Sequence, residues 1–138
     1  MITNTQFLDV LGVLRDHLIL CRDLPEIASV DVQDHLVDGM AVTVYLCAHR
    51  LVDVAEGLLA WADTLTRVTC ELWRPSETSI HAHVYGRLPG ELPVKVFCGT
   101  HFRADVFGSE LRVKERRTIP LGQLRGWAAA DTAAEVSA

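Results

Sequence analysis

The sequence predicts an α+β fold: a mostly antiparallel sheet of five to six strands, with two main helices packed on one face and a short C-terminal helix. Two observations carry this prediction. Residues 68–100 alternate between apolar and polar side chains over three short segments, as strands with one buried face do. Residues 5–21 and 49–65 instead repeat apolar side chains every three or four positions, which is typical of amphipathic helices.

The first helix is expected to begin near Thr5, with Thr3 or Asn4 as its N-cap, and to end before Pro25. One apolar stripe along this helix consists of Phe7, Leu11, Leu14, Leu18 and Cys21. Two strands should follow, at residues 27–32 and 40–47. The first alternates weakly between apolar and polar side chains, and the second is rich in β-branched side chains.

The second helix is expected over residues 49–65, where Gly57 suggests close packing against the sheet because glycine weakens a helix interior. After the three strands of residues 68–100, a less regular piece covers 101–108, and a charged edge strand is predicted over 111–119. Pro120 can open a short last helix. Residues 1–127 should form a single domain, and the Ala-rich residues 128–138 are predicted to be a disordered tail.

The alternation in residues 68–100 separates a core wall from an outward face. The core wall consists of Val68, Cys70, Leu72, Ile80, Ala82, Val84, Val94, Val96 and Cys98. The outward face consists of Thr69, Glu71, Trp73, His81, His83, Tyr85, Arg87, Lys95 and Phe97. Tyr45 of the strand at 40–47 would extend this aromatic face if the register of that strand allows it.

Composition narrows the class of protein. A net charge of −5 argues against a general nucleic-acid binder, whose affinity depends on neutralising phosphates. Eleven Arg against two Lys is typical of a GC-rich bacterial or phage genome. The four Cys residues are widely spaced without a CxxC motif and are expected to be reduced core residues. No secretion signal or transmembrane segment is recognised, so a cytoplasmic location is expected, without membrane partners.

The function that this pattern favours is a non-enzymatic binding or accessory protein that acts through protein–protein contacts on the aromatic sheet face. Aromatic and Arg side chains concentrate binding energy at interfaces. The expected partner is another protein or a second copy of the chain, with a homodimer as the expected state. The predicted contact residues are Tyr45, Trp73, His83, Tyr85 and Phe97. No catalytic residue and no cofactor is assigned, because nucleophile and phosphate-loop motifs are missing.

One structural alternative stays open. The C-terminal helix carries Leu121, Leu124 and Trp127 along one side, and it could fold over the aromatic sheet face within the same chain. That arrangement would remove the proposed contact surface.

Two functional alternatives also stay open. His81 and His83 lie two apart on one strand face and could bind a metal ion, with Glu71 or His101 as a third ligand; the chain would then be a small metal-binding protein or a metal-dependent hydrolase. Alternatively, the cationic residues of the last predicted strand could contact nucleic acid as part of an accessory factor. These residues are Arg112, Lys114, Arg116 and Arg117.

Overall fold

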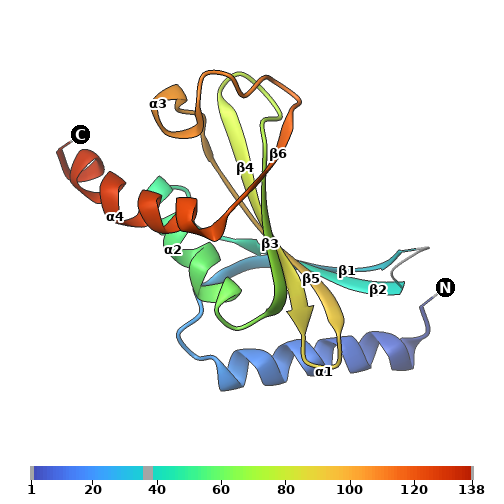
Figure 1. Cartoon of the computed structure of the whole chain (residues 1–138). Helices are drawn as coiled ribbons and strands as arrows, with labels where there is room; N and C mark the ends of the chain where they lie inside the picture. Colours follow the sequence, from blue (N-terminus) through green and yellow to red (C-terminus); the bar gives the residue numbers. More distant parts are fainter. Residues whose placement is uncertain (1, 36–38, 138) are drawn as a thin grey trace.

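The computed structural model describes residues 2–35 and 39–137 of the chain, and its elements are labelled in Figure 1. Their order is α1 (Asn4–Leu20), β1 (Ile27–His35), β2 (Gly39–Leu46), α2 (Leu51–Ala62), β3 (Thr66–Trp73), β4 (Ser79–Leu88), β5 (Leu92–His101), α3 (Ala104–Phe107), β6 (Arg116–Ile119) and α4 (Leu121–Ser137). The α+β class is therefore confirmed.

The described strands form one six-stranded sheet in the order β1-β2-β5-β4-β3-β6. Strands β1 and β2 form a hairpin, and β3, β4 and β5 form an antiparallel meander to which β6 adds an edge. The hairpin and the meander meet where β2 pairs with β5 in parallel. The sheet is thus mixed, but the prediction that it is mostly antiparallel is confirmed.

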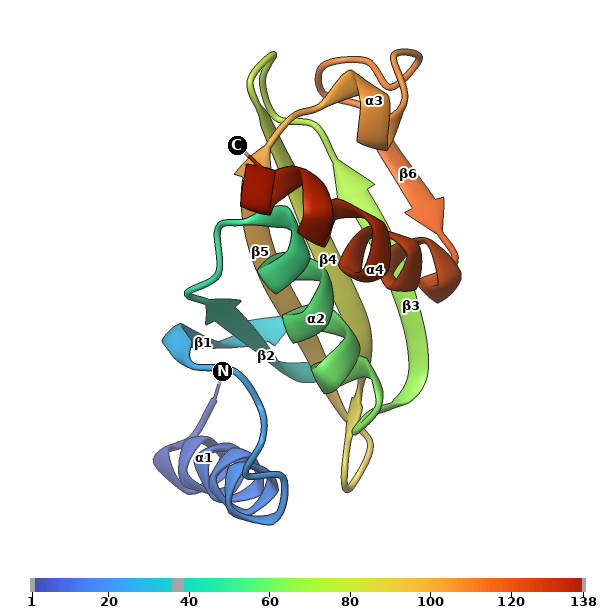
Figure 2. The ribbon, with the colours of Figure 1, turned by 90° about the vertical axis from the view of Figure 1, so that its left-hand side faces the viewer.

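The sheet twists strongly, as neighbouring strands do because of their right-handed twist. In Figure 1, β1 and β2 run across the picture, whereas β3 and β4 run up it. Helices α2 and α4 lie on one side of the upright strands, and α1 lies beneath the β1–β2 hairpin. Figure 2 shows α2 and α4 in front of the sheet from the helical side. No described helix lies over the opposite side of the sheet, which we call the open face.

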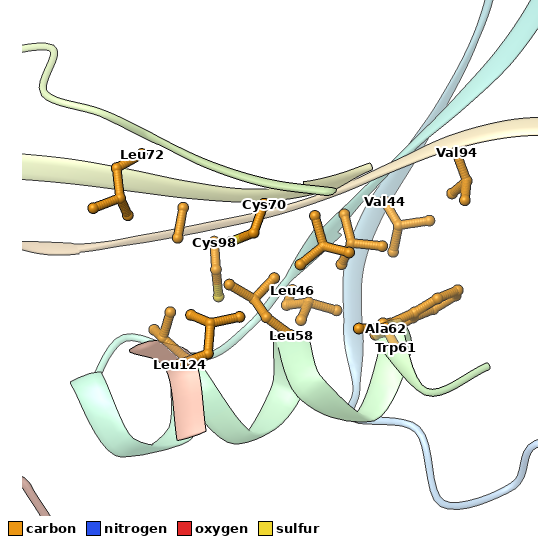
Figure 3. Packing of buried hydrophobic residues seen from close by; sticks show 14 of the residues in the cluster. Val44, Leu46, Leu58, Trp61, Ala62, Cys70, Leu72, Val94, Cys98 and Leu124 are labelled. Atoms are coloured by element: carbon orange, nitrogen blue, oxygen red, sulfur yellow. The ribbon is translucent and has the colours of Figure 1, made fainter. Parts of the chain in front are cut away.

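The core lies between the sheet and α2. The predicted core wall is confirmed from Cys70 to Cys98, since its side chains there are at most 3% exposed; only Val68 is half-buried. Figure 3 shows Leu58 and Trp61 of α2 in this layer, with Leu124 of α4 close by. Helix α2 buries most of its side chains, with Asp53 and Glu56 exposed, because α4 packs on it as well.

Gly57 confirms the close approach that its position in α2 suggests. A Cβ atom at this position would lie 3.2 Å from Cδ1 of Leu46 on β2 and 3.4 Å from Cγ of Pro25. Glycine at this point therefore lets α2 pack tightly against the end of β2 and the segment that precedes β1.

The side chains that α1 buries differ from the predicted apolar stripe. Of the two predicted N-caps, Thr3 is the one that caps this helix, and it forms a capping box with Gln6. Its buried side chains, however, are Val10, Leu14 and His17, whereas Phe7 and Leu11 are exposed. The physical reason is that α1 packs through one narrow contact, in which His17 stacks on Trp61 and hydrogen-bonds Thr64 at 2.9 Å.

The C-terminal part of the chain differs from the prediction in two ways. The last strand is only Arg116–Ile119, because Leu111 turns into the core and Lys114 adopts a positive φ of 70°. The last helix is not short: α4 runs to Ser137, and the segment after Trp127 is rich in alanine, the strongest helix former. Whether residues 128–138 are disordered in solution stays a prediction.

Candidate functional site

The strand registers place one row of side chains across the open face. Tyr45 is paired with Phe97, Phe97 with His83, and His83 with Glu71, on the adjacent strands β2, β5, β4 and β3. Thr118 of β6 continues this row next to Glu71. Because residues paired directly across strands point to the same face, the predicted extension of the aromatic face by Tyr45 is confirmed.

The aromatic and histidine rings of the open face form one connected group, which we call the ring cluster. It consists of Tyr45, Trp73, His81, His83, Tyr85 and Phe97. Phe97 lies at its centre, with ring centroids 5.2 Å from Tyr45, 4.6 Å from His81 and 5.2 Å from His83. Trp73 and Tyr85 lie at the margins, next to His81 and His83 respectively. The five predicted contact residues therefore lie together.

His83 lies below the surface of this cluster. It is 2% exposed, although it belongs to the face that no described helix covers. Its Nδ1 atom lies 3.2 Å from the Tyr85 hydroxyl, which also donates to the Glu71 carboxylate, and its Nε2 atom has no hydrogen-bond partner among the described residues. His83 therefore offers almost no surface to a partner, and the other four predicted residues, all half-buried, provide the accessible area.

Burial keeps the imidazoles of the cluster neutral. The pKa of His83 is lowered to about 3, chiefly by burial and then by the charge of Lys95. The pKa of His81 is lowered for the same two reasons. Protonating either ring would place a charge in a poorly hydrated site beside another cation, which is unfavourable. The cluster is consequently an uncharged, ring-rich surface at neutral pH.

One ion pair borders the cluster at β3 and β6. Arg116 donates to the Glu71 carboxylate at 2.9 Å, and its guanidinium carbon lies 4.8 Å from the centre of the Trp73 ring. Arginine stacked on an aromatic ring is common at binding surfaces because the contact stays favourable in water. The sequence pattern placed Glu71, His81 and Lys95 on the outward face but outside the predicted contact set. It assigned Arg116 only to the nucleic-acid alternative, because the pairing of Arg116 with Trp73 depends on the register of β6.

The C-terminal helix does not cover the ring cluster. Leu124 of α4 is fully buried in the core between the sheet and the helices, and Trp127 packs against Phe107 of α3 at 5.1 Å between ring centroids. Helix α4 also packs along α2. The alternative in which Leu121, Leu124 and Trp127 fold over the aromatic face is therefore wrong.

Helix α1 carries a second apolar surface, of which the sequence pattern assigned only Phe7 and Leu11 to the apolar stripe of the helix. Six large apolar side chains of the described residues are exposed, and five of them belong to α1. These five are Phe7, Leu8, Leu11, Ile19 and Leu20. No residue of the ring cluster is as exposed as these five side chains. The exposed side of α1 is therefore the main alternative to the open face as a contact surface.

The metal-binding alternative has limited geometric support. His81 and His83 share the open face, with ring centroids 6.4 Å apart, and each has one buried ring nitrogen without a partner in the described part of the chain. The described residues contain no group of three or more His, Cys, Asp or Glu side chains that could hold a metal ion. The HxH metal site stays a prediction without an identified third ligand.

The nucleic-acid alternative loses the continuous strand on which it was based. Arg112 and Lys114 lie in the turn before β6, and Arg116 and Arg117 point to opposite faces because they are neighbours on one strand. Arg116 pairs with Glu71, and Arg117 pairs with Glu110 at 3.1 Å and Glu115 at 3.5 Å. These carboxylates offset much of the positive charge that a phosphate backbone would need, and the alternative stays a prediction.

The cysteines are only partly as expected. Cys70 and Cys98 are buried, whereas Cys21 is half-buried and Cys47 is exposed. Burial raises the pKa of Cys70 to about 12 and that of Cys98 to about 11. Since the thiolate is the nucleophile, these two buried side chains are unreactive at neutral pH.

Comparisons with family models, with curated proteins and with solved structures found no match for this chain. Among the described residues, no helix combines the length and the apolar character needed to cross a bilayer.

Proposed function

We propose that this chain is a non-enzymatic binding or accessory protein whose open sheet face engages a protein partner, with a second copy of the chain as the expected partner. One observation carries the proposal: a connected cluster of six rings lies on the face of the sheet that no described helix covers. Interfaces are enriched in such rings because each contributes large, rigid contact area at low entropic cost.

Within this proposal, the residues of the cluster have different roles. Tyr45, Trp73, Tyr85 and Phe97 form the contact surface, because each is half-buried by the isolated chain. His83 supports them from below, holding the Tyr85 hydroxyl through its Nδ1 atom. The Arg116–Glu71 pair beside Trp73 belongs to the polar rim that surrounds an apolar interface centre.

The location and origin of the protein are part of the same proposal. A cytoplasmic protein of a GC-rich bacterium or phage is supported by the excess of Arg over Lys, and by the four cysteines, which are all free thiols.

The test compares two surface variants by sedimentation equilibrium. Tyr45→Ala with Trp73→Ala removes two rings of the cluster, on β2 and β3, and leaves its centre, Phe97, intact. Leu8→Ala with Leu20→Ala is the matched control on α1, where these side chains are 66% and 81% exposed. We expect a dimeric wild type, at least about tenfold weaker association of the sheet variant because interface rings dominate affinity, and no change for the α1 variant.

Two outcomes would contradict the proposal. A wild-type chain that stays monomeric up to the highest soluble concentration would overturn the homodimer. A dimer that the α1 variant dissociates, and that the sheet variant leaves intact, would move the interface to the exposed apolar side chains of α1. Circular dichroism of each variant separates loss of association from loss of folding.

A further inference from the structure

A cavity of about 480 Å³ lies on the open face, next to the ring cluster and at the end nearest the β4–β5 turn. Its lining combines three cationic side chains with three hydroxyl groups, from Arg67, Arg87, Lys95, Thr43, Thr69 and Tyr85. This volume is in the range of small-molecule sites. Among the described residues, no carboxylate belongs to the lining.

The strand registers explain why these groups converge. Lys95 of β5 is paired with Thr43 on β2 at one side and with Tyr85 on β4 at the other. Arg87 is paired with Thr66 across a β-bulge between Thr66 and Thr69. Within this bulge Arg67 adopts a positive φ of 54°. A bulge re-aims the side chain it contains, and here it adds Arg67 to the cavity that Lys95 and Arg87 line.

The positive charges of the cavity are poorly compensated. Among the described residues, Arg67 has a single ion pair, with Glu91 at 3.7 Å, in which both side chains are largely exposed and the interaction is therefore weak. Arg87 reaches only the main-chain oxygen of Glu91, at 3.4 Å. Lys95 is half-buried and forms no ion pair within the described residues.

Lys95 is the strongest indication that the cavity binds an anion. A half-buried ammonium group without an ion-pair partner is an unfavourable arrangement, because burial removes hydration that the Tyr85 ring, 6.0 Å from Nζ, replaces only in part. The pKa of Lys95 is lowered by that burial and by the charge of Arg116, against a smaller opposite effect of Glu71. An anion bound beside Lys95 would supply the missing compensation.

We propose that this cavity is a binding site for a small organic anion that carries a carboxylate or phosphate group. The oxyanion lies against Lys95 and is held by the guanidinium groups of Arg67 and Arg87, whose planar donors match carboxylate and phosphate oxygens. The hydroxyls of Thr43 and Thr69 donate further hydrogen bonds. The apolar remainder of the ligand packs on Tyr85 and Pro93. This site shares Tyr85 with the ring cluster, but the cationic groups that hold the anion lie outside that cluster.

The test follows amide chemical shifts of the full chain by NMR during titration with citrate and, separately, with pyrophosphate. Chloride keeps the ionic strength constant in both titrations, which screens non-specific attraction equally. Saturable shifts at millimolar or lower concentration, centred on Thr43, Lys95 and Arg87, are the expected result. A response to citrate alone identifies carboxylates as the ligand class, and a response to pyrophosphate alone identifies phosphates.

Three variants locate the binding. Lys95→Met keeps the length of the side chain and removes its charge, and Arg87→Gln removes one guanidinium; each should weaken binding about tenfold, as loss of a charge-assisted hydrogen bond does. Arg125→Gln removes one positive charge from the exposed side of α4 and should bind like the wild type. Absence of saturable shifts for both anions, or equal weakening by all three variants, would overturn the site.

Discussion

His17 and His83 are the buried polar side chains among the described residues. The Thr64 hydroxyl donates its proton to the carbonyl oxygen of Trp61 at 2.8 Å, so it must accept from Nε2–H of His17. His83 instead has one ring nitrogen near the Tyr85 hydroxyl and one without a partner. His17 is thus a satisfied core residue that joins α1 to α2, whereas His83 supports the ring cluster.

The stability of the fold should fall in acid because of His83. Its pKa in the folded chain is about 3, below the ordinary value of 6.5 that applies when it is unfolded. Between these values the unfolded chain binds a proton that the folded chain does not, so the free energy of unfolding falls by about 1.4 kcal/mol for each pH unit below 6.5. Above 6.5 the contribution of His83 is constant.

Urea unfolding of wild type and His83→Phe at several pH values measures this effect. The variant lacks the titrating group and should lose that part of the pH dependence, while the exposed His49→Gln control keeps it. Glu71, Tyr85, Lys95, His81 and Arg116 also surround position 83 and remain in every variant. An unchanged slope in His83→Phe would show that His83 is protonated normally in the folded chain.

The role of core packing can be tested with a pair of identical substitutions. Leu58→Ala removes a side chain of α2 that is fully buried, and it should lower the free energy of unfolding by about 2–5 kcal/mol because it leaves a cavity. Leu20→Ala removes a side chain of α1 that is 81% exposed, and its effect should stay within about 0.5 kcal/mol. Similar losses from both, measured by urea unfolding, would contradict the described position of α1.

At the scale of elements, two glycines show where backbone packing is tight and where it is open. A Cβ atom at Gly86 of β4 would lie 2.9 Å from Cβ of Leu65 and 3.2 Å from the main-chain oxygen of Thr66. A Cβ atom at Gly12 of α1 would meet nothing within 4 Å. Strand β4 therefore approaches the beginning of β3 closely, while α1 has one side that no described element contacts near Gly12.

Alanine at these two positions should have opposite effects. Gly12→Ala should stabilise the chain by about 0.5–1 kcal/mol, because alanine favours the helix and no contact is disturbed. Gly86→Ala should destabilise it by about 1–3 kcal/mol through the clash with Leu65 and Thr66. Thermal unfolding of the two variants measures these changes in stability. A stabilised Gly86→Ala variant would mean that β3 and β4 are further apart than described.

At the scale of the whole molecule, the sequence predicted what depends on local periodicity. Alternation along β3, β4 and β5 identified both faces of the central sheet, because side-chain direction in a strand follows from position alone. The same rule placed Tyr45 on the ring-bearing face once the parallel pairing of β2 with β5 was known. Helix α2 was recognised as well, since its apolar side chains repeat with helical spacing.

Features that depend on tertiary contacts were not predictable in this way. The buried stripe of α1 is set by where Trp61 and Thr64 lie, and not by the apolar spacing of α1 itself. The burial of His83 depends on Phe97 and Tyr85 lying next to it across and along the strands. The basic cavity needs the bulge at Arg67, which no local signal marks.

The most direct measurement compares the exposure of side chains at low and high protein concentration, using NMR relaxation by a soluble paramagnetic probe. In the dilute protein, ring protons of Tyr45 and Trp73 should be relaxed by the probe, since the open face is uncovered. In the concentrated protein these rings should become protected, while the Leu8 and Leu20 methyl groups of α1 stay accessible. Protection of the α1 methyl groups with no change at the two rings would contradict the account.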